Sequence, residues 1–186
     1  MMNINLADVN WWAQIPFFLA AILLLVRVVV GTKKGFIKEV CSLISVVIAS
    51  IAVVLIAFGV RKYFDHEVVM VVAAIVLVLL LGIIYKLLDV FLVSLKLISK
   101  LPVVSLIDKI LGLILGIVET VFIIWAIYCI ITIMQPSAFG NWIINCVKNN
   151  TIMKFLYVHN FMFGWISNWF DKLIGLHLLE KIGFVK

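Results

Sequence analysis

Four long runs of apolar residues, separated by short polar segments, dominate the sequence. The runs cover about residues 12–30, 36–60, 68–85 and 110–134. A helix of about 20 predominantly apolar residues crosses a hydrocarbon core about 30 Å thick. Each run therefore predicts a membrane-spanning helix. The sequence predicts an all-α fold, a polytopic membrane helical bundle whose four transmembrane helices occupy residues 1–134.

Two further segments carry polar and apolar residues on opposite helical faces. The third run continues past residue 85 without Pro or Gly as far as Leu101, and its charged face holds Lys86, Asp89, Lys96 and Lys100. The tail, residues 135–186, is rich in Trp, Phe, Asn and Lys, and its polar stripe consists of Asn160, Gly164, Ser167, Asn168, Asp171, Lys172 and Gly175. Such patterns are typical of amphipathic helices in the membrane interface. We expect both segments to lie there, because a fifth span would place Asn and Asp in lipid.

The composition agrees with a membrane protein. Hydrophobic residues make up 66% and charged residues 13% of the 186 positions, against about 45–50% and 25% in soluble domains. A soluble domain of this size could not bury so much apolar surface, so the lipid bilayer is the principal expected partner. The net charge is +6. Because the basic residues stand at the ends of apolar runs, we expect contact with lipid headgroups and no binding of nucleic acid.

The distribution of lysines predicts the orientation. Two connecting segments, 31–38 and 86–109, are rich in lysine, and both join spans on the same side of the membrane. The positive-inside rule places these two loops in the cytoplasm and both termini outside. No basic residue precedes the first run and no small-residue cleavage pattern follows it, so we expect that helix to be an uncleaved anchor.

Four residues recur at a spacing of four around the first connection. They are Arg27, Gly31, Gly35 and Glu39. We expect Gly31 and Gly35 to bracket a short lysine loop between antiparallel spans. Arg27 and Glu39 would then face each other near the cytoplasmic interface, to which Arg27 can extend its long side chain, and we predict that they form an ion pair.

Small residues mark the surfaces where helices are expected to touch. In lipid, close helix contacts depend on small side chains rather than on a hydrophobic force. The second span carries a stripe of Ser42, Ser45, Ala49 and Ala52. The fourth span carries a ladder at a spacing of four, formed by Asp108, Gly112, Gly116 and Thr120. Asp108 also stands at the helix start, where the helix dipole favours a negative charge.

Residues with catalytic or metal-binding spacing are not apparent. The chain contains no nucleophile elbow, phosphate-binding loop, HExxH motif or paired carboxylates. Its three cysteines lack a CxxC pair and its three histidines lack ligand spacing. We therefore expect no metal, no cofactor and no enzymatic activity.

Glu119 is the charged residue that lies well inside a predicted span. It lies about 14 Å from the start of that span at 1.5 Å per residue, and an ionisable residue at such a depth is a functional candidate. Two structural alternatives are a protonated glutamic acid bonded to a neighbouring helix and an ion pair with Arg27. A role in transport is the functional alternative.

Two motifs resemble one family, the colicin V production (CvpA) proteins of bacterial inner membranes. The first is Gly31-x-x-Lys34-Gly35-Phe36-Ile37-Lys38-Glu39, similar to the family pattern G-x-x-[KR]-G-hydrophobic-x-x-E. The second is Asp108-Lys109-x-x-Gly112-x-x-x-Gly116, similar to D-[RK]-x-x-G-x-x-x-G. The resemblance covers about residues 15–134 and leaves the tail unexplained.

The resemblance implies a multi-pass protein of the cell membrane with a role in bacteriocin production, a toxin biosynthetic process, and in envelope upkeep. The main hypothesis is a non-enzymatic accessory protein that associates with itself or with a membrane partner such as an export system. The alternative is a small transporter or channel that uses Glu119.

Overall fold

Seven α-helices form almost all of the part of the chain that the structure describes. The computed structural model describes residues 11–63, 66–94, 106–134 and 138–174. In chain order the helices are α1 (Trp11–Lys34), α2 (Phe36–Tyr63), α3 (Glu67–Ser94), α4 (Leu106–Ile133), α5 (Ala138–Asn149), α6 (Thr151–Val158) and α7 (Phe161–Ile174). No strand occurs in these described ranges, so the predicted all-α fold is confirmed.

The first four helices are the membrane-spanning ones. Among the described residues, the helical segments long and apolar enough to cross a bilayer are Trp12–Lys34, Phe36–Arg61, Glu67–Phe91 and Leu106–Ile133. The predicted four-span bundle is confirmed. These segments extend beyond several of the predicted apolar runs because backbone N–H and C=O groups near lipid need partners, and a continuing helix supplies them.

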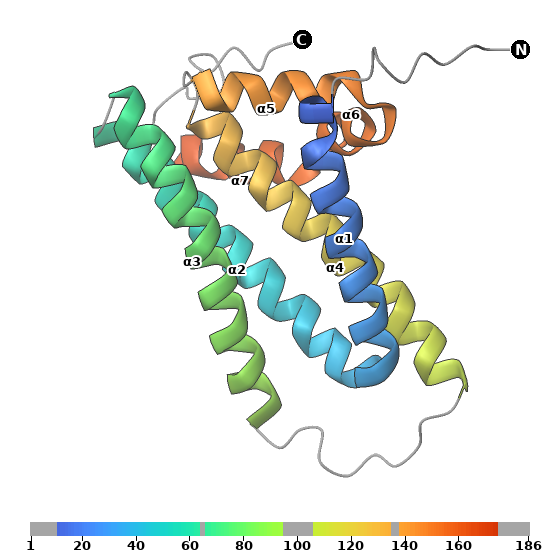
Figure 1. The fold of residues 1–186 in the computed structure, drawn as a ribbon. Helices are drawn as coiled ribbons and strands as arrows, with labels where there is room; N and C mark the ends of the chain where they lie inside the picture. The colour runs from blue at the N-terminus through green and yellow to red at the C-terminus, as the bar shows by residue number, and fades with distance from the viewer. Residues whose placement is uncertain (1–10, 64–65, 95–105, 135–137, 175–186) are drawn as a thin grey trace, which may run out of the picture.

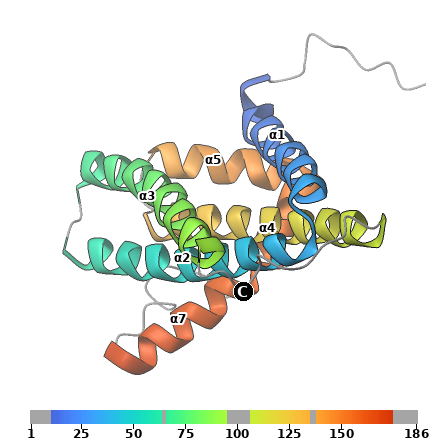
Figure 2. The same cartoon turned by 90° about the horizontal axis from the view of Figure 1, so that it is seen from below.

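The order of packing differs from the order of the chain. Helix α2 contacts α3 and α4, and α4 in turn packs along α1 (Figure 1). Helices α1 and α2 are joined at the lower end in that view, yet they diverge from there and touch each other little. Seen from below, α7 projects beyond α2 to the side (Figure 2). Helix α4 is therefore the central helix of the bundle. It packs against α1 and α2, and α3 is attached mainly through α2.

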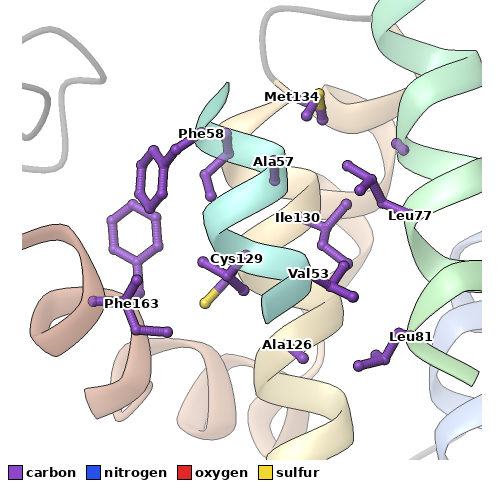
Figure 3. Packing of buried hydrophobic residues seen from close by; sticks show 14 of the residues in the cluster. Val53, Ala57, Phe58, Leu77, Leu81, Ala126, Cys129, Ile130, Met134 and Phe163 are labelled. Carbon is purple, nitrogen blue, oxygen red and sulfur yellow. The ribbon is translucent and has the colours of Figure 1, made fainter. Parts of the chain in front are cut away.

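The apolar core lies between α2, α3, α4 and α7. Figure 3 shows Leu77 and Leu81 of α3 on one side and Phe58 of α2 beside Phe163 of α7 on the other. Between them lies Cys129 of α4, a free thiol that is fully buried. A small, weakly polar side chain of this kind packs as an apolar residue, which agrees with the absence of a disulfide among the described cysteines.

The connection between α1 and α2 is shorter than the sequence suggested. Gly31 lies inside α1, and the chain reverses at Gly35 alone, where φ is +80°. The N–H of Gly35 donates to the carbonyl of Gly31 at 3.2 Å, a single bond that closes the helix in the left-handed conformation glycine adopts without strain. The expected lysine loop between two bracketing glycines is therefore wrong. Lys33 and Lys34 belong to the last turn of α1.

Helix α3 continues without interruption to Ser94. The predicted continuation of this helix past residue 85 is confirmed, with Tyr85 and Asp89 bonded to Arg27 and Lys34 and with Lys86 exposed. That this segment lies in the membrane interface stays a prediction. Lys96 and Lys100, placed on the same face by sequence, lie outside the described residues.

The described part of the tail forms three short helices, α5, α6 and α7. Asn150 separates α5 from α6, and its side chain caps α6 by accepting from the N–H groups of Ile152 and Met153 at 3.1 and 3.2 Å. Asn160 has a comparable role before α7, accepting from the N–H of Phe163 at 3.3 Å. Side-chain caps satisfy the first N–H groups of a helix. The polar residues predicted as one stripe thus include helix boundaries, and Ser167 of that stripe is buried.

Candidate functional site

Glycines bring α1 and α4 into backbone contact. A Cβ atom on Gly31 would collide with the carbonyl oxygen of Gly112, and one on Gly112 would collide with that of Gly31. A Cβ atom on Gly116 would lie 2.8 Å from the carbonyl oxygen of Arg27. Each step of four residues forward along α1 matches a step of four residues back along α4. The two helices are therefore antiparallel and in a fixed register.

The same register continues at the Gly35 turn. A Cβ atom on Gly35 would collide with the Asp108 carboxyl, and that carboxyl accepts a hydrogen bond from the N–H of Phe36 at 2.8 Å. Asp108 of α4 thus caps the N-terminus of α2, where the helix dipole favours a negative charge. The two motifs found by sequence are consequently the two sides of one contact within the chain.

Arg27 extends from this contact into the bundle. Its Nη1 lies 3.1 Å from Oε1 of Glu119 and donates to the hydroxyl of Tyr85 at 2.6 Å. The guanidinium carbon also lies 4.5 Å from the centre of the Tyr85 ring, a cation–π distance. The side chain of Glu119 is fully buried and that of Arg27 is 14% exposed. Arg27 therefore does not reach the interface as expected, because its partners lie inside.

Ser42 of α2 connects Glu119, Tyr85 and Lys34. Its hydroxyl donates to Oε1 of Glu119 at 3.0 Å and lies 2.7 Å from the hydroxyl of Tyr85. Because the one hydroxyl hydrogen of Ser42 goes to Glu119, Tyr85 is the donor to Ser42. Nζ of Lys34 also donates to Ser42, at 3.3 Å. Lys34 forms an ion pair with Asp89 at 3.4 Å, where both side chains are partly exposed.

Glu39 occupies the centre of this arrangement. It is fully buried, and its Oε1 would lie 3.4 Å from a Cβ atom on Gly31 and 3.6 Å from one on Gly116. Gly116 lies one turn before Glu119 on α4, and Ser42, one turn after Glu39 on α2, bonds to Glu119, so the two carboxyl groups are neighbours. Among the residues that the structure describes, no hydrogen-bond donor reaches either oxygen of Glu39 or Oε2 of Glu119. Two carboxyl groups thus meet in the interior without a donor between them.

The predicted ion pair between Arg27 and Glu39 is wrong. Arg27 pairs with Glu119, one of the alternatives that the sequence left open for that residue. The reason is the packing order, because α1 lies along α4 and not along α2, so the side chain of Arg27 meets α4 first.

Three of the residues that meet here, Ser42, Tyr85 and Asp89, were not predicted as site residues. Ser42 was assigned to a packing stripe, and Asp89 to a face at the membrane interface. Tyr85 was treated only as the last residue of the third apolar run. A signal was present in their spacing, since Glu39 and Ser42 are three residues apart and Tyr85 and Asp89 four apart, so each pair shares a helical face. We define the buried polar cluster as Arg27, Lys34, Glu39, Ser42, Tyr85, Asp89 and Glu119.

No group of three or more His, Cys, Asp or Glu with metal-binding geometry occurs within the described part of the chain. His66 and His159 are exposed, and His159 packs against Phe155 at 4.2 Å between ring centroids. The ring nitrogen of His159 bonds to a backbone carbonyl of its own helix.

The fold and the cluster define a multi-pass membrane protein whose helices are joined in the interior by charges. A sequence model of the family described as colicin V production protein matches residues 18–157. The chain belongs to that family. The match runs past the predicted limit at residue 134, so α5 and most of α6 are part of the family's sequence. No curated protein matches the chain. No solved structure matches it either.

Proposed function

We propose that this protein is a non-enzymatic accessory protein of the bacterial inner membrane that supports the production or export of a peptide bacteriocin, and more generally envelope upkeep. The family match over residues 18–157 is the observation that carries this proposal. The buried polar cluster is consistent with it. Apart from Glu39, each member of the cluster already has a hydrogen-bond or ion-pair partner within it, which suits a role in holding helices together.

A partner would bind to a face other than the glycine ladder. Gly31, Gly112 and Gly116 are occupied by the contact of α1 with α4, so an oligomer or export system has to use the outward sides of the helices. Helix α1 offers a row of exposed apolar side chains, Phe18, Leu19, Ile22, Leu25, Val26 and Val29. We place the partner on this row or on the similarly exposed side of α3, and expect it to be a second copy or another membrane protein.

Deletion and complementation in the producing bacterium test the proposal. Loss of the gene should reduce the amount of secreted toxin peptide, and the parent chain should restore it. Gly82→Ala should restore it equally, because a Cβ atom there meets nothing within 4 Å. Photo-crosslinkers placed at Leu25 should also capture a membrane-protein partner in cells. Unchanged toxin secretion and unchanged envelope resistance after deletion would contradict the proposal.

We place the end of the bundle with the Gly35 turn in the cytoplasm. Support comes from Lys33, Lys38, Lys86 and Lys109, which are exposed near that end, because basic residues favour the cytoplasmic side. The test uses single cysteines in a chain that lacks Cys41, Cys129 and Cys146. A membrane-impermeant maleimide should modify Tyr63→Cys in intact cells, and Lys38→Cys only after the cells are opened. The reverse pattern would invert the proposed topology.

A second candidate function is transport of a small solute or ion, with Glu119 at the site. The observation that favours it is the convergence of polar groups from α1, α2, α3 and α4 inside the bundle, since transporters bind their substrates between helices at such places. Reconstitution in liposomes separates the two candidates. Absence of flux, or flux that Glu119→Gln leaves unchanged, would remove transport and leave the accessory role intact.

A further inference from the structure

We propose that the carboxyl groups of Glu39 and Glu119 form a proton-binding site in which one proton is shared between them. The proposal concerns the chemistry of the buried polar cluster and is independent of any role in toxin export. It rests on three observations: the contact between two buried carboxyl groups, the balance of charge around them, and a chain of hydroxyl groups that leads to the surface.

The contact itself requires a proton. Both carboxyls are fully buried and are neighbours, because Oε1 of Glu39 lies beside Gly116, one turn before Glu119, and Ser42, one turn after Glu39, bonds to Glu119. No donor among the described residues reaches Oε1 or Oε2 of Glu39, or Oε2 of Glu119. An ionised carboxylate is an acceptor only, so two of them cannot bond to each other. One proton between them supplies the missing donor and removes the repulsion of adjacent like charges in a medium of low dielectric constant.

The surrounding charges balance when that proton is present. Among the residues that the structure describes, the cations that face the pair are Arg27 and Lys34 of α1. Asp89 of α3 is the third carboxyl group, paired with Lys34. Two cations therefore stand against three carboxyl groups, and the cluster is neutral when one carboxyl of the Glu39–Glu119 pair is protonated. Tyr85 and Ser42 face the cluster as neutral hydroxyls. Uptake of one proton from water changes the charge of the pair from two negative charges to one.

A hydrogen-bonded path leads from the pair toward solvent. Lys34 and Asp89 are 28% and 20% exposed at the rim. From Lys34 the path continues to the hydroxyl of Ser42 at 3.3 Å and then to Oε1 of Glu119 at 3.0 Å. The hydroxyl of Tyr85 joins at Ser42, at 2.7 Å. Such a chain of donors and acceptors lets protons exchange without opening the bundle, and it makes Ser42 a positioning residue for that exchange.

Infrared spectroscopy of the protein in lipid nanodiscs tests the site directly. A protonated carboxyl has a C=O stretching band that carboxylates lack. The parent protein should show this band at neutral pH, shifted in heavy water, and Glu39→Gln should lose it. Glu67→Gln is the matched control, because Glu67 is exposed and should contribute no protonated carboxyl at neutral pH. Ser42→Ala should keep the band but slow its exchange in heavy water.

The pH dependence of unfolding is a second measurement, independent of the infrared band. When the proton leaves, two buried negative charges remain in contact, so the stability of the parent should fall as pH rises. In Glu39→Gln the side-chain amide replaces the proton as a permanent donor, and this loss should be absent. A band absent at every pH at which the protein is folded, or present in Glu39→Gln and Glu119→Gln alike, would overturn the proposal. So would a band that disappears when sodium is added at constant pH, because a metal cation would then occupy the site.

Discussion

Arg27 of α1 and Glu119 of α4 form an ion pair of 3.1 Å in the interior of the bundle. Ninety-two positions separate them in the sequence (119 − 27), and the pair fixes the first membrane helix to the last. Neither charge is left with a single partner, because Tyr85 accepts from Arg27 and Ser42 donates to Glu119. Charges removed from water are tolerated when they are paired and bonded in this way.

The first prediction is that breaking this pair destabilises the protein strongly. Arg27→Leu should lower the free energy of unfolding by about 3–5 kcal/mol, because Glu119 is left as an uncompensated buried charge. The double variant Arg27→Leu/Glu119→Gln should lose less than the sum of the single changes. Unfolding in mixed micelles measures both, and Lys33→Gln is the control, since Lys33 is exposed on the same helix. Additive losses would show that the two residues do not interact.

The second prediction concerns the Gly35 turn. Gly35 has φ of +80°, and a residue with a Cβ atom in that conformation costs about 1–2 kcal/mol. Gly35→Ala should cost at least this much, because the added Cβ also collides with the Asp108 carboxyl. Gly59→Ala is the control, as its Cβ meets nothing within 4 Å. Equal melting temperatures for the two variants would contradict the turn geometry.

The third prediction tests the cap that α4 provides for α2. Asp108 accepts from the N–H of Phe36 at 2.8 Å. Asp108→Ala should destabilise by about 0.5–2 kcal/mol, the usual loss when a capping side chain is removed. Asp108→Asn keeps an accepting oxygen and should lose a smaller part. Hydrogen exchange at the start of α2 is the local measurement. Exchange that is unchanged in Asp108→Ala would rule out the cap.

The fourth prediction concerns the attachment of the tail. Asn160 donates to the carbonyl of Trp125 at 3.1 Å, and the indole N–H of Trp125 donates to the carbonyl of Leu156 at 2.9 Å. Asn160→Ala should free the segment between α6 and α7 and increase its cleavage by protease. Asn168→Ala is the matched control, because Asn168 is exposed on α7. Equal cleavage of both variants would show that Asn160 does not hold the tail on α4.

Features that depend on neighbouring residues in the chain could be predicted from the sequence, and contacts between distant helices could not. Apolar length and lysine position depend on local composition, so four spans were predictable. The spacing of four also predicted that Gly112 and Gly116 share one face of their helix, but it did not predict which helix that face contacts. The identity of that helix was not encoded locally. The hairpin-like connection suggested that α1 would pack on α2, whereas the glycines of α1 match those of α4.

The sequence did not identify which side chains pair inside the bundle. Arg27 had two acidic candidates, Glu39 and Glu119, and chain proximity favoured the wrong one. Tyr85 lay in an apolar run, where an aromatic ring is ordinary, and its hydroxyl gained meaning only once α3 was placed near α1. The helix boundaries in the tail were missed for a different reason. Asn160 was counted as part of a polar stripe, although Asn before a helix is also a capping residue.

The two glycine motifs form one contact within the chain, between α1 and α4. The most direct measurement is the free energy of unfolding of Gly112→Ala beside Gly82→Ala in the same micelles. An added methyl group at Gly112 collides with the backbone of Gly31, and overpacking of this kind costs about 1–3 kcal/mol. At Gly82 nothing lies within 4 Å of the added Cβ, so stability should be unchanged or slightly higher. A clear loss for Gly112→Ala alone, in the monomer, is the predicted result. Equal stability of the two variants would contradict the contact.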